Sequence, residues 1–264
     1  MTSVRRIRIA SLICAAVAAG VTGCAKSDGA VGESTSNASA APADTFAGLT
    51  AEQIDRKARD ATSGATSVRI AGALAAGSKS FELDLAVTRA GTCKGSFNDG
   101  TGTVQVRKTS ETVLYIQAEE TFWRAALASR SEELTPAQRD TVAEALGGHW
   151  VKADPDLAHT LGGGLCNLDK LMKPLLDGGT GSLVRAADTT VNGTPAAELI
   201  QKGDGGSTST LNVAKEGKPY VLTLESVGGA TPGKVTMSDY EKPVVVTPPP
   251  ASEVVDPSKP RPGS

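Results

Sequence analysis

The sequence predicts an α+β fold in which an antiparallel sheet is interrupted by a central group of short helices. Between Phe81 and Val87, large apolar residues alternate with small or charged ones, which is the pattern of a half-buried strand. The stretches Asn98-Asp99-Gly100 and Asn192-Gly193 are hairpin-turn signals, each lying between two strand-like segments. Capping-box signatures at Thr50 and Thr135 mark the starts of two helices.

The N-terminus is organised like a bacterial lipoprotein signal. Three arginines within the first eight residues precede an apolar stretch from Ile9 to Ala19, which is shorter than the roughly 20 residues needed to span a bilayer. The run Val21-Thr22-Gly23-Cys24 then has the pattern of a lipobox. We expect residues 1–23 to be removed and Cys24 to carry fatty acyl chains such as palmitate, which anchor the protein to the outer face of the cell membrane. The alternative is a secretory signal in which Cys24 is incidental.

The charge balance of the expected mature chain is acidic. The whole sequence has 27 Lys and Arg against 29 Asp and Glu, and residues 1–23 contain three arginines and no acid. Removing them leaves 24 basic and 29 acidic residues, a net charge of −5. No basic patch is visible, which argues against nucleic acid as a partner and against electrostatic docking on anionic lipid.

The cysteines leave one pair once the signal is accounted for. Cys14 is removed with the signal and Cys24 is the acylation site, so Cys93 and Cys166 remain. Exported proteins meet an oxidising environment, which predicts a Cys93–Cys166 disulfide. Two buried free thiols are the alternative. A metal site is disfavoured, because two cysteines this far apart without paired histidines lack ligand spacing.

The first half of the chain predicts a tether, a helix and a strand meander. Residues 24–47 are rich in Ser, Ala, Gly and Thr and predict a flexible tether, so the folded domain is expected over residues 48–250. Its first helix begins at the Thr50 cap, runs to about Ser63 and stops at Gly64. Antiparallel strands are predicted over residues 67–74 and 81–87, from Cys93, through Val104 and Val106, and over residues 111–117.

Helices are predicted in the central region, and strands return after it. A helix over residues 118–129 precedes one that starts at Thr135 and reaches Leu146, and Trp150-Val151-Lys152 predicts a short strand. Residues 157–161 predict a helical turn, Gly162-Gly163-Gly164 a flexible link, and residues 168–176 a helix interrupted by Pro174. Further strands are expected over 183–191, 195–201, 207–214, 219–225 and 233–240. Residues 244–250 close the domain, and residues 251–264 predict a disordered tail.

No catalytic or cofactor signature is found in the sequence. It contains no G-x-S-x-G, S-x-x-K, P-loop, G-x-G-x-x-G or H-E-x-x-H motif. The only histidines are His149 and His159, and each is better explained as a structural or surface residue than as a base. We therefore expect no enzymatic activity, no cofactor and no metal. An exported hydrolase is the weakest alternative, with these two histidines as its only candidates.

The apolar face of the predicted sheet needs a cover. Its side chains are mostly Ala, Val, Leu and Ile, and only 3% of the sequence is aromatic, which leaves room that large side chains would otherwise fill. Such a sheet can enclose an apolar ligand cavity. An ordinary packed core requires the same alternation and is the alternative.

Several stretches in a fixed order resemble one protein family. They are Leu114-Tyr115-Ile116 before Phe122-Trp123, Trp150-Val151-Lys152, Gly217-Lys218-Pro219-Tyr220, and Ser238-Asp239-Tyr240 leading to Pro243-Val244-Val245-Val246. In this order the chain resembles the LppX/LprA/LprF/LprG family of actinobacterial lipoproteins, whose fold is similar to that of the LolA and LolB lipoprotein carriers. The resemblance implies a curved antiparallel half-barrel with helices packed in its concave face. It also implies an apolar cavity for acyl chains of phospholipids or glycolipids. The family has no fixed lining motif, so no ligand-binding residues are assigned.

These observations lead to one expected function and one alternative. We expect a membrane-anchored envelope lipoprotein that binds lipid or glycolipid acyl chains, for transport or presentation. The alternative is a non-catalytic envelope interaction or sensor module with a filled core. The sequence indicates neither the particular lipid nor any protein partner.

Overall fold

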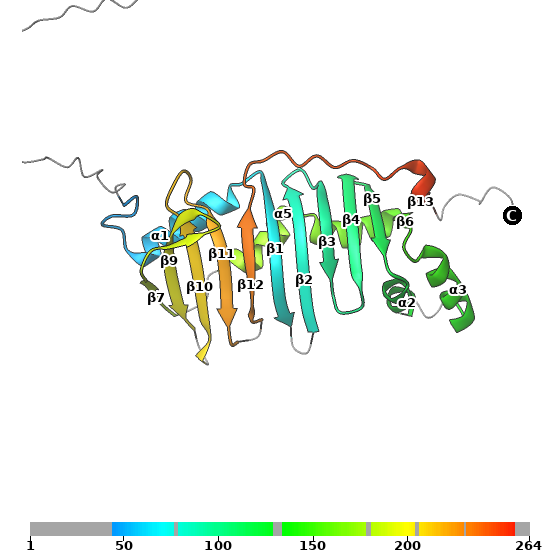
Figure 1. The fold of residues 1–264 in the computed structure, drawn as a ribbon, viewed down its shortest axis with the longest axis horizontal. Helices are drawn as coiled ribbons and strands as arrows, with labels where there is room; N and C mark the ends of the chain where they lie inside the picture. Colours follow the sequence, from blue (N-terminus) through cyan, green and yellow to red (C-terminus); the bar gives the residue numbers. More distant parts are fainter. Residues whose placement is uncertain are drawn as a thin grey trace, which may run out of the picture. The chain divides into compact units, whose positions relative to one another are not determined.

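A single large, unclosed antiparallel sheet organises the protein (Figure 1). The structure is a computed structural model that describes residues 44–76, 79–128, 134–177, 181–203, 206–229 and 231–256. The predicted signal, the acylation site Cys24 and the tether up to residue 43 lie outside the described residues, as do residues 257–264. The predicted α+β class is confirmed.

The strands follow one another almost in chain order. They are β1 (Ser67–Ala76), β2 (Lys79–Thr88), β3 (Cys93–Asn98), β4 (Thr103–Ser110), β5 (Val113–Ala118), β6 (Trp150–Lys152), β7 (Ser182–Arg185), β8 (Thr189–Val191), β9 (Thr194–Lys202), β10 (Thr208–Ala214), β11 (Val221–Val227), β12 (Gly233–Ser238) and β13 (Val254–Val255). Within the described residues their order in space is β13-β6-β5-β4-β3-β2-β1-β12-β11-β10-β9-β7, with β8 also paired to β9. Antiparallel pairing of β1 with β12 joins the first meander to the second.

Three of the five helices found in the described residues lie against one face of this sheet. The five are α1 (Ala51–Ser63), α2 (Glu120–Ala128), α3 (Pro136–Leu146), α4 (Pro155–Leu165) and α5 (Leu168–Leu176). Helix α1 contacts β7, β10 and β11, α4 contacts β5, and α5 contacts both α1 and α4. Figure 1 shows α1 and α5 behind the strands, with α2 and α3 beyond the β5 end of the sheet. The predicted arrangement of helices on one face of an open sheet is therefore confirmed.

Both predicted capping boxes are confirmed. At the start of α1, the backbone N–H of Thr50 donates to Oε1 of Gln53 at 2.9 Å, and the N–H of Gln53 donates to Oγ1 of Thr50 at 3.3 Å. Thr135 and Gln138 form the same reciprocal pair at the start of α3. Each box satisfies N–H groups that the first turn of a helix leaves unpaired. Ile54 of α1 is fully buried, so this capped helix is fixed on the sheet.

The triple glycine is helical, and the predicted flexible link is wrong. Helix α4 runs through Gly162, Gly163 and Gly164 to Leu165. A Cβ at Gly162 would lie 3.1 Å from Cδ and Cε of Lys108, so the missing side chain makes room for the Lys108 methylenes. Lys108 is only 6% exposed and reaches past the helix in this gap. Close packing against a long side chain therefore outweighs the low helix propensity of glycine.

Two further boundaries differ from the sequence prediction. Helix α5 continues through Pro174, because burial of Leu168 and Met172 on the sheet holds this short helix, which ends two residues later. The strand predicted over residues 183–191 is split into β7 and β8, which both pair with β9. Asp188 lies in the break and forms ion pairs with Arg185 and Lys215.

Both ends of the folded unit extend beyond the predicted domain. Phe46, expected in the tether, is 2% exposed and belongs to the core. Residues 241–253 run as a strap along the upper ends of the strands (Figure 1), and Ala251–Val255, expected in the disordered tail, form a 3-10 turn and strand β13. Strand β13 pairs in parallel with β6, so backbone hydrogen bonding at this sheet edge orders the segment.

The first described residues are held by an ion-pair network. Asp44 accepts from Nη2 of Arg185 at 2.8 Å and from the backbone N–H of Phe46 at 3.1 Å. Lys215 lies 3.2 Å from the same carboxylate. The hydrogen bond from Arg185, followed by that from Phe46, lowers the pKa of Asp44 to about 2. The chain therefore enters the sheet at a fixed point beside β7 and β10.

The substitution Gly163→Ala is expected to raise the free energy of unfolding by about 0.5–1 kcal/mol, because alanine is the better helix former and the added Cβ meets open space. Gly162→Ala is the matched control and should gain less, since its Cβ contacts Lys108. Urea denaturation of both variants measures the difference. A stability gain at Gly162 equal to that at Gly163 would contradict the packing explanation.

The Asp44→Asn substitution is expected to lower stability at pH 7. The folded pKa is depressed, so the carboxylate stabilises the fold above its unfolded pKa of about 4, and this contribution is lost as the pH falls towards 2. Urea midpoints of wild type and variant should therefore differ at pH 7 and converge near pH 2. A difference that persists undiminished at pH 2 would show that the charge of Asp44 is not its cause.

Candidate functional site

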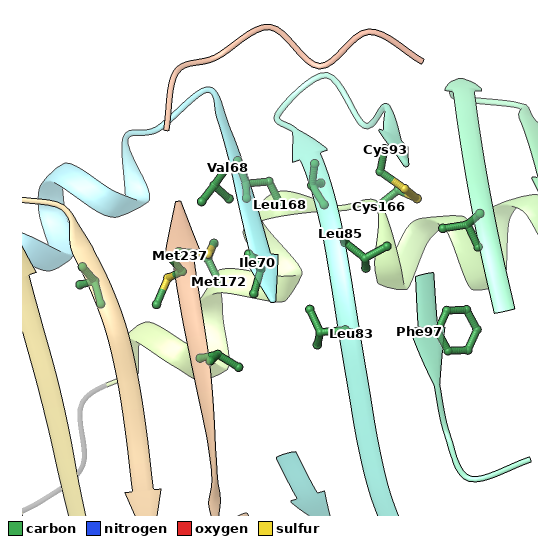
Figure 2. Packing of buried hydrophobic residues seen from close by; sticks show 14 of the residues in the cluster. Val68, Ile70, Leu83, Leu85, Cys93, Phe97, Cys166, Leu168, Met172 and Met237 are labelled. Carbon is green, nitrogen blue, oxygen red and sulfur yellow. A yellow bond between two sulfur atoms is a disulfide. The ribbon is translucent and has the colours of Figure 1, made fainter. Parts of the chain in front are cut away.

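The helix-facing side of the sheet carries the apolar core. Figure 2 shows Val68, Ile70, Leu83, Leu85 and Met237 of the central strands pointing toward the helices, with Leu168 and Met172 facing them from α5. These residues alternate along β1, β2 and β12 with outward-facing polar residues such as Arg69 and Asp84. The alternation of Phe81, Leu83, Leu85 and Val87 that predicted β2 is confirmed, since all four belong to this side.

The core is not filled everywhere, because a cavity of about 290 Å³ lies between α5 and the strands β1, β2, β11 and β12. Its apolar lining consists of Ile70, Leu74, Phe81, Leu83, Leu171, Leu224 and Val235, and its polar lining includes Lys170, Ser226 and Thr231. Ligand pockets in proteins usually measure about 300–1,000 Å³, so this cavity is at the small end of that range.

The cavity is apolar at its mouth as well as at its base. Ile70 and Val235 are buried at its base, while Leu74, Phe81 and Leu224 are only partly buried. Large apolar side chains that remain partly exposed around a hollow are unfavourable in water, because some of their surface is not removed from solvent. They indicate a site suited to an apolar ligand.

A row of aromatic rings borders the cavity on the side of β3 and α2. The rings of Phe81 and Phe97 stack with centroids 5.9 Å apart, and Phe122 meets Phe97 edge-on at 6.4 Å. Trp123 continues the row, 5.5 Å from Phe122. These contacts connect the cavity wall to α2, although the two segments are far apart in the sequence. Although only 3% of the sequence is aromatic, four of the aromatic side chains are therefore gathered in one row beside the cavity.

The disulfide fixes the helical cover to the sheet. Cys93 at the start of β3 and Cys166 between α4 and α5 are joined, with Cα atoms 5.3 Å apart (Figure 2). Both residues are buried. The side chain of Asn167 then accepts from the N–H of Lys170 at 2.9 Å, which caps α5 directly after the bridge. The disulfide at Cys166 and the cap at Asn167 are on consecutive residues, so together they fix the start of α5, the helix that covers the cavity.

The two histidines do not form a catalytic constellation. His149 precedes β6 and His159 lies in α4, and both are exposed. No group of His, Cys, Asp or Glu suited to a metal ion occurs in the described part of the chain. Among the same residues, no helix combines the length and the apolar character needed to cross a membrane. Neither histidine is among the residues that line the apolar cavity.

Comparisons with known proteins place the fold. Neither a protein-family model nor a curated protein matches the chain. The crystal structure of LprF from Mycobacterium bovis is similar at a TM-score of 0.52 and 15% identity, covering 75% of this chain and 96% of LprF. The crystal structure of the lipoprotein LppX from Mycobacterium tuberculosis has a TM-score of 0.42 and 16% identity, and the match covers 74% of this chain and 96% of LppX. The LolA superfamily protein NE2245 from Nitrosomonas europaea has a TM-score of 0.22 and 10% identity, and the match covers 75% of this chain and 95% of NE2245. The protein thus has the fold of the LprF lipoprotein.

Replacing both Cys93 and Cys166 by alanine is expected to cost about 2–4 kcal/mol of unfolding free energy, because the bridge closes a loop of 73 residues in the unfolded chain. Urea denaturation without reductant compares the variant with wild type. Wild type in reductant should unfold like the variant. A loss below about 1 kcal/mol would show that the bridge adds little to fixing the cover.

Proposed function

We propose that the protein is an envelope lipoprotein that binds an acyl chain of a lipid or glycolipid in the cavity beneath α5, for transport or presentation. The observation that carries this proposal is the apolar cavity whose half-buried walls include Leu74, Phe81 and Leu224. The LprF-like fold supports it.

An acyl chain matches the chemistry of the cavity walls. Burying apolar surface contributes about 25 cal/mol per Å², or about 0.8 kcal/mol per methylene group. A methylene chain would bury the exposed parts of the wall residues and its own surface at once. A cavity of about 290 Å³ suits part of a single chain better than several chains. The ligand would therefore leave its headgroup outside, near the polar residues Lys170, Ser226 and Thr231.

The N-terminal anchor would bring the cavity to the membrane. Acylation at Cys24 of the Val21-Thr22-Gly23-Cys24 run would hold the chain at the outer face of the cell membrane. Asp44 lies 20 positions after Cys24, and a chain of this length reaches at most about 70 Å when extended. This length lets the folded unit move over the bilayer without leaving it. The proposed activity is binding alone, since the described histidines are exposed and apart from the cavity.

The filled-core alternative also has support. Most of the helix-facing side is packed, and Ile54, Leu85, Val87 and Met237 are fully or almost fully buried. In that case the protein would be an envelope interaction or sensor module, and the cavity would stay empty. The two functions differ in one observable, which is bound lipid.

Residues 25–264 expressed without the signal are expected to co-purify with extractable lipid. Native mass spectrometry should show the protein with one bound lipid, because a cavity of about 290 Å³ suits part of one acyl chain better than several chains. Delipidated protein should take up added phospholipid. Only the bare protein mass, with no uptake after lipid addition, would favour the interaction or sensor module.

The substitution Leu224→Trp is expected to reduce lipid binding at least about tenfold, because the larger ring fills the cavity from β11. Val184→Trp is the matched control, since Val184 lies on β7 outside the cavity and is 50% exposed. Lipid titration monitored by native mass spectrometry compares the two variants. Equal effects of both substitutions would place the lipid elsewhere.

A further inference from the structure

The face of the sheet opposite the helices carries paired cations. In the antiparallel register, Lys94 of β3 lies directly opposite Arg107 of β4. Two residues further along β3, and on the same face, Ser96 lies opposite Gln105. Directly opposed side chains on one face have Cβ atoms about 4.5–5.5 Å apart, and like charges in such positions are destabilising. The Lys94–Arg107 pair therefore requires a compensating partner or solvent.

The strap of residues 241–253 turns this face into a cleft. Ser67 Oγ donates to the carbonyl of Lys242 at 2.7 Å, and Nη1 of Arg107 donates to the carbonyl of Thr247 at 3.3 Å. Between the strap and the sheet lies a cleft of about 570 Å³. Its charged lining residues are Arg69, Asp84, Lys94, Arg107, Asp239 and Lys242. This volume is in the range of sites for organic ligands and exceeds the need of a single inorganic ion.

Two positive charges in the cleft lack a counter-charge among the described residues. Arg69 pairs with Asp84 at 2.6 Å, so that carboxylate is already neutralised. The carboxylate of Asp239 is neutralised in the same way by a lysine of the strap at 2.6 Å. Lys94 and Arg107 form no ion pair within the part of the chain that the structure describes. The excess of positive charge is thus concentrated at one register position.

Arg107 is preoriented for binding an oxyanion. Its guanidinium lies 4.5 Å from the centre of the Trp150 ring, and Trp150 is 4% exposed. This cation–π contact holds the guanidinium in place, while its N–H groups remain available beyond the one that contacts the strap. Ser96 and Gln105, which also line the cleft, add neutral donors beside it. This combination of a guanidinium held over an aromatic ring, an ammonium and neutral donors is suited to phosphate.

We propose that the cleft between the strap and strands β2–β4 binds an organic phosphate, held by Lys94 and Arg107. The site is separate from the acyl cavity, which lies on the helix-facing side of the sheet. It does not rest on the lipid-binding function. The phosphate belongs either to a soluble ester or to a phospholipid headgroup, and both sources present the same group to the two cations.

Glycerol 1-phosphate is the soluble probe, titrated into residues 25–264 and followed by amide chemical shifts. We expect shift changes concentrated at residues 94–96 and 105–107 and at the strap. Lys94→Glu should weaken binding at least about tenfold, because it replaces a ligand cation by a repelling charge. Lys94→Gln should weaken it less and guards against misfolding of the charge-reversal variant. Leu224→Trp should bind the probe like wild type.

Lys57→Glu is the matched control. Lys57 is an exposed lysine on α1, and this substitution changes the net charge by the same amount as Lys94→Glu. It should bind glycerol 1-phosphate within about twofold of wild type, a difference too small for the loss of a charged hydrogen bond. The absence of any shift at residues 94–107 would overturn the proposal. Equal weakening by Lys57→Glu and Lys94→Glu would also overturn it, by showing attraction through net charge alone.

Vesicles distinguish the two sources of phosphate. The protein is cosedimented with phosphatidylcholine vesicles that contain or lack phosphatidylglycerol. Binding that requires phosphatidylglycerol and is lost in Lys94→Glu supports a lipid headgroup as the ligand. Binding of glycerol 1-phosphate without preference between the vesicles supports a soluble ester. If neither probe binds, the cleft is not a phosphate site.

Discussion

The pairing of β1 with β12 is the constraint on which the rest of the structure depends. It joins two meanders that are otherwise separate in the sequence and so creates one continuous sheet. Ile70 opposes Met237 across this pairing, and Gly72 opposes Val235. A shift of one strand by one residue would move its apolar side chains, such as Ile70 or Met237, to the other face. The apolar side and the charged side of the sheet are therefore set by the same set of backbone hydrogen bonds.

The helical cover is fixed unevenly, and this explains where the cavity lies. At its start, α5 is held by the Cys93–Cys166 bridge, the Asn167 cap and burial of Leu168. Along its length, Met172 packs deeply while Leu171 is only partly buried and lines the cavity. The hollow is thus placed beside a helix whose start is fixed but whose flank is incompletely packed. Such a flank can adjust to an occupant without unfolding the sheet.

Local patterns predicted the elements whose stability is local. The alternation in β2 and the capping boxes of α1 and α3 depend on neighbouring residues, so they were readable from sequence. The helical conformation of the triple glycine in α4 could not be predicted in this way, because it depends on packing against Lys108, from a strand more than 50 residues earlier. The strap was also missed, since its order depends on contacts such as that between Arg107 and Thr247.

The candidate sites show the same division at the level of side chains. Alternation revealed that Leu83 faces the core, but it did not reveal that part of this core is hollow. The sequence likewise shows no basic patch, because Lys94 and Arg107 are thirteen positions apart and meet only through the register of β3 and β4. Antiparallel pairing therefore concentrates charge in a protein whose overall charge is negative. This arrangement gives the two faces of one sheet opposite chemistry, apolar beneath the helices and cationic beneath the strap.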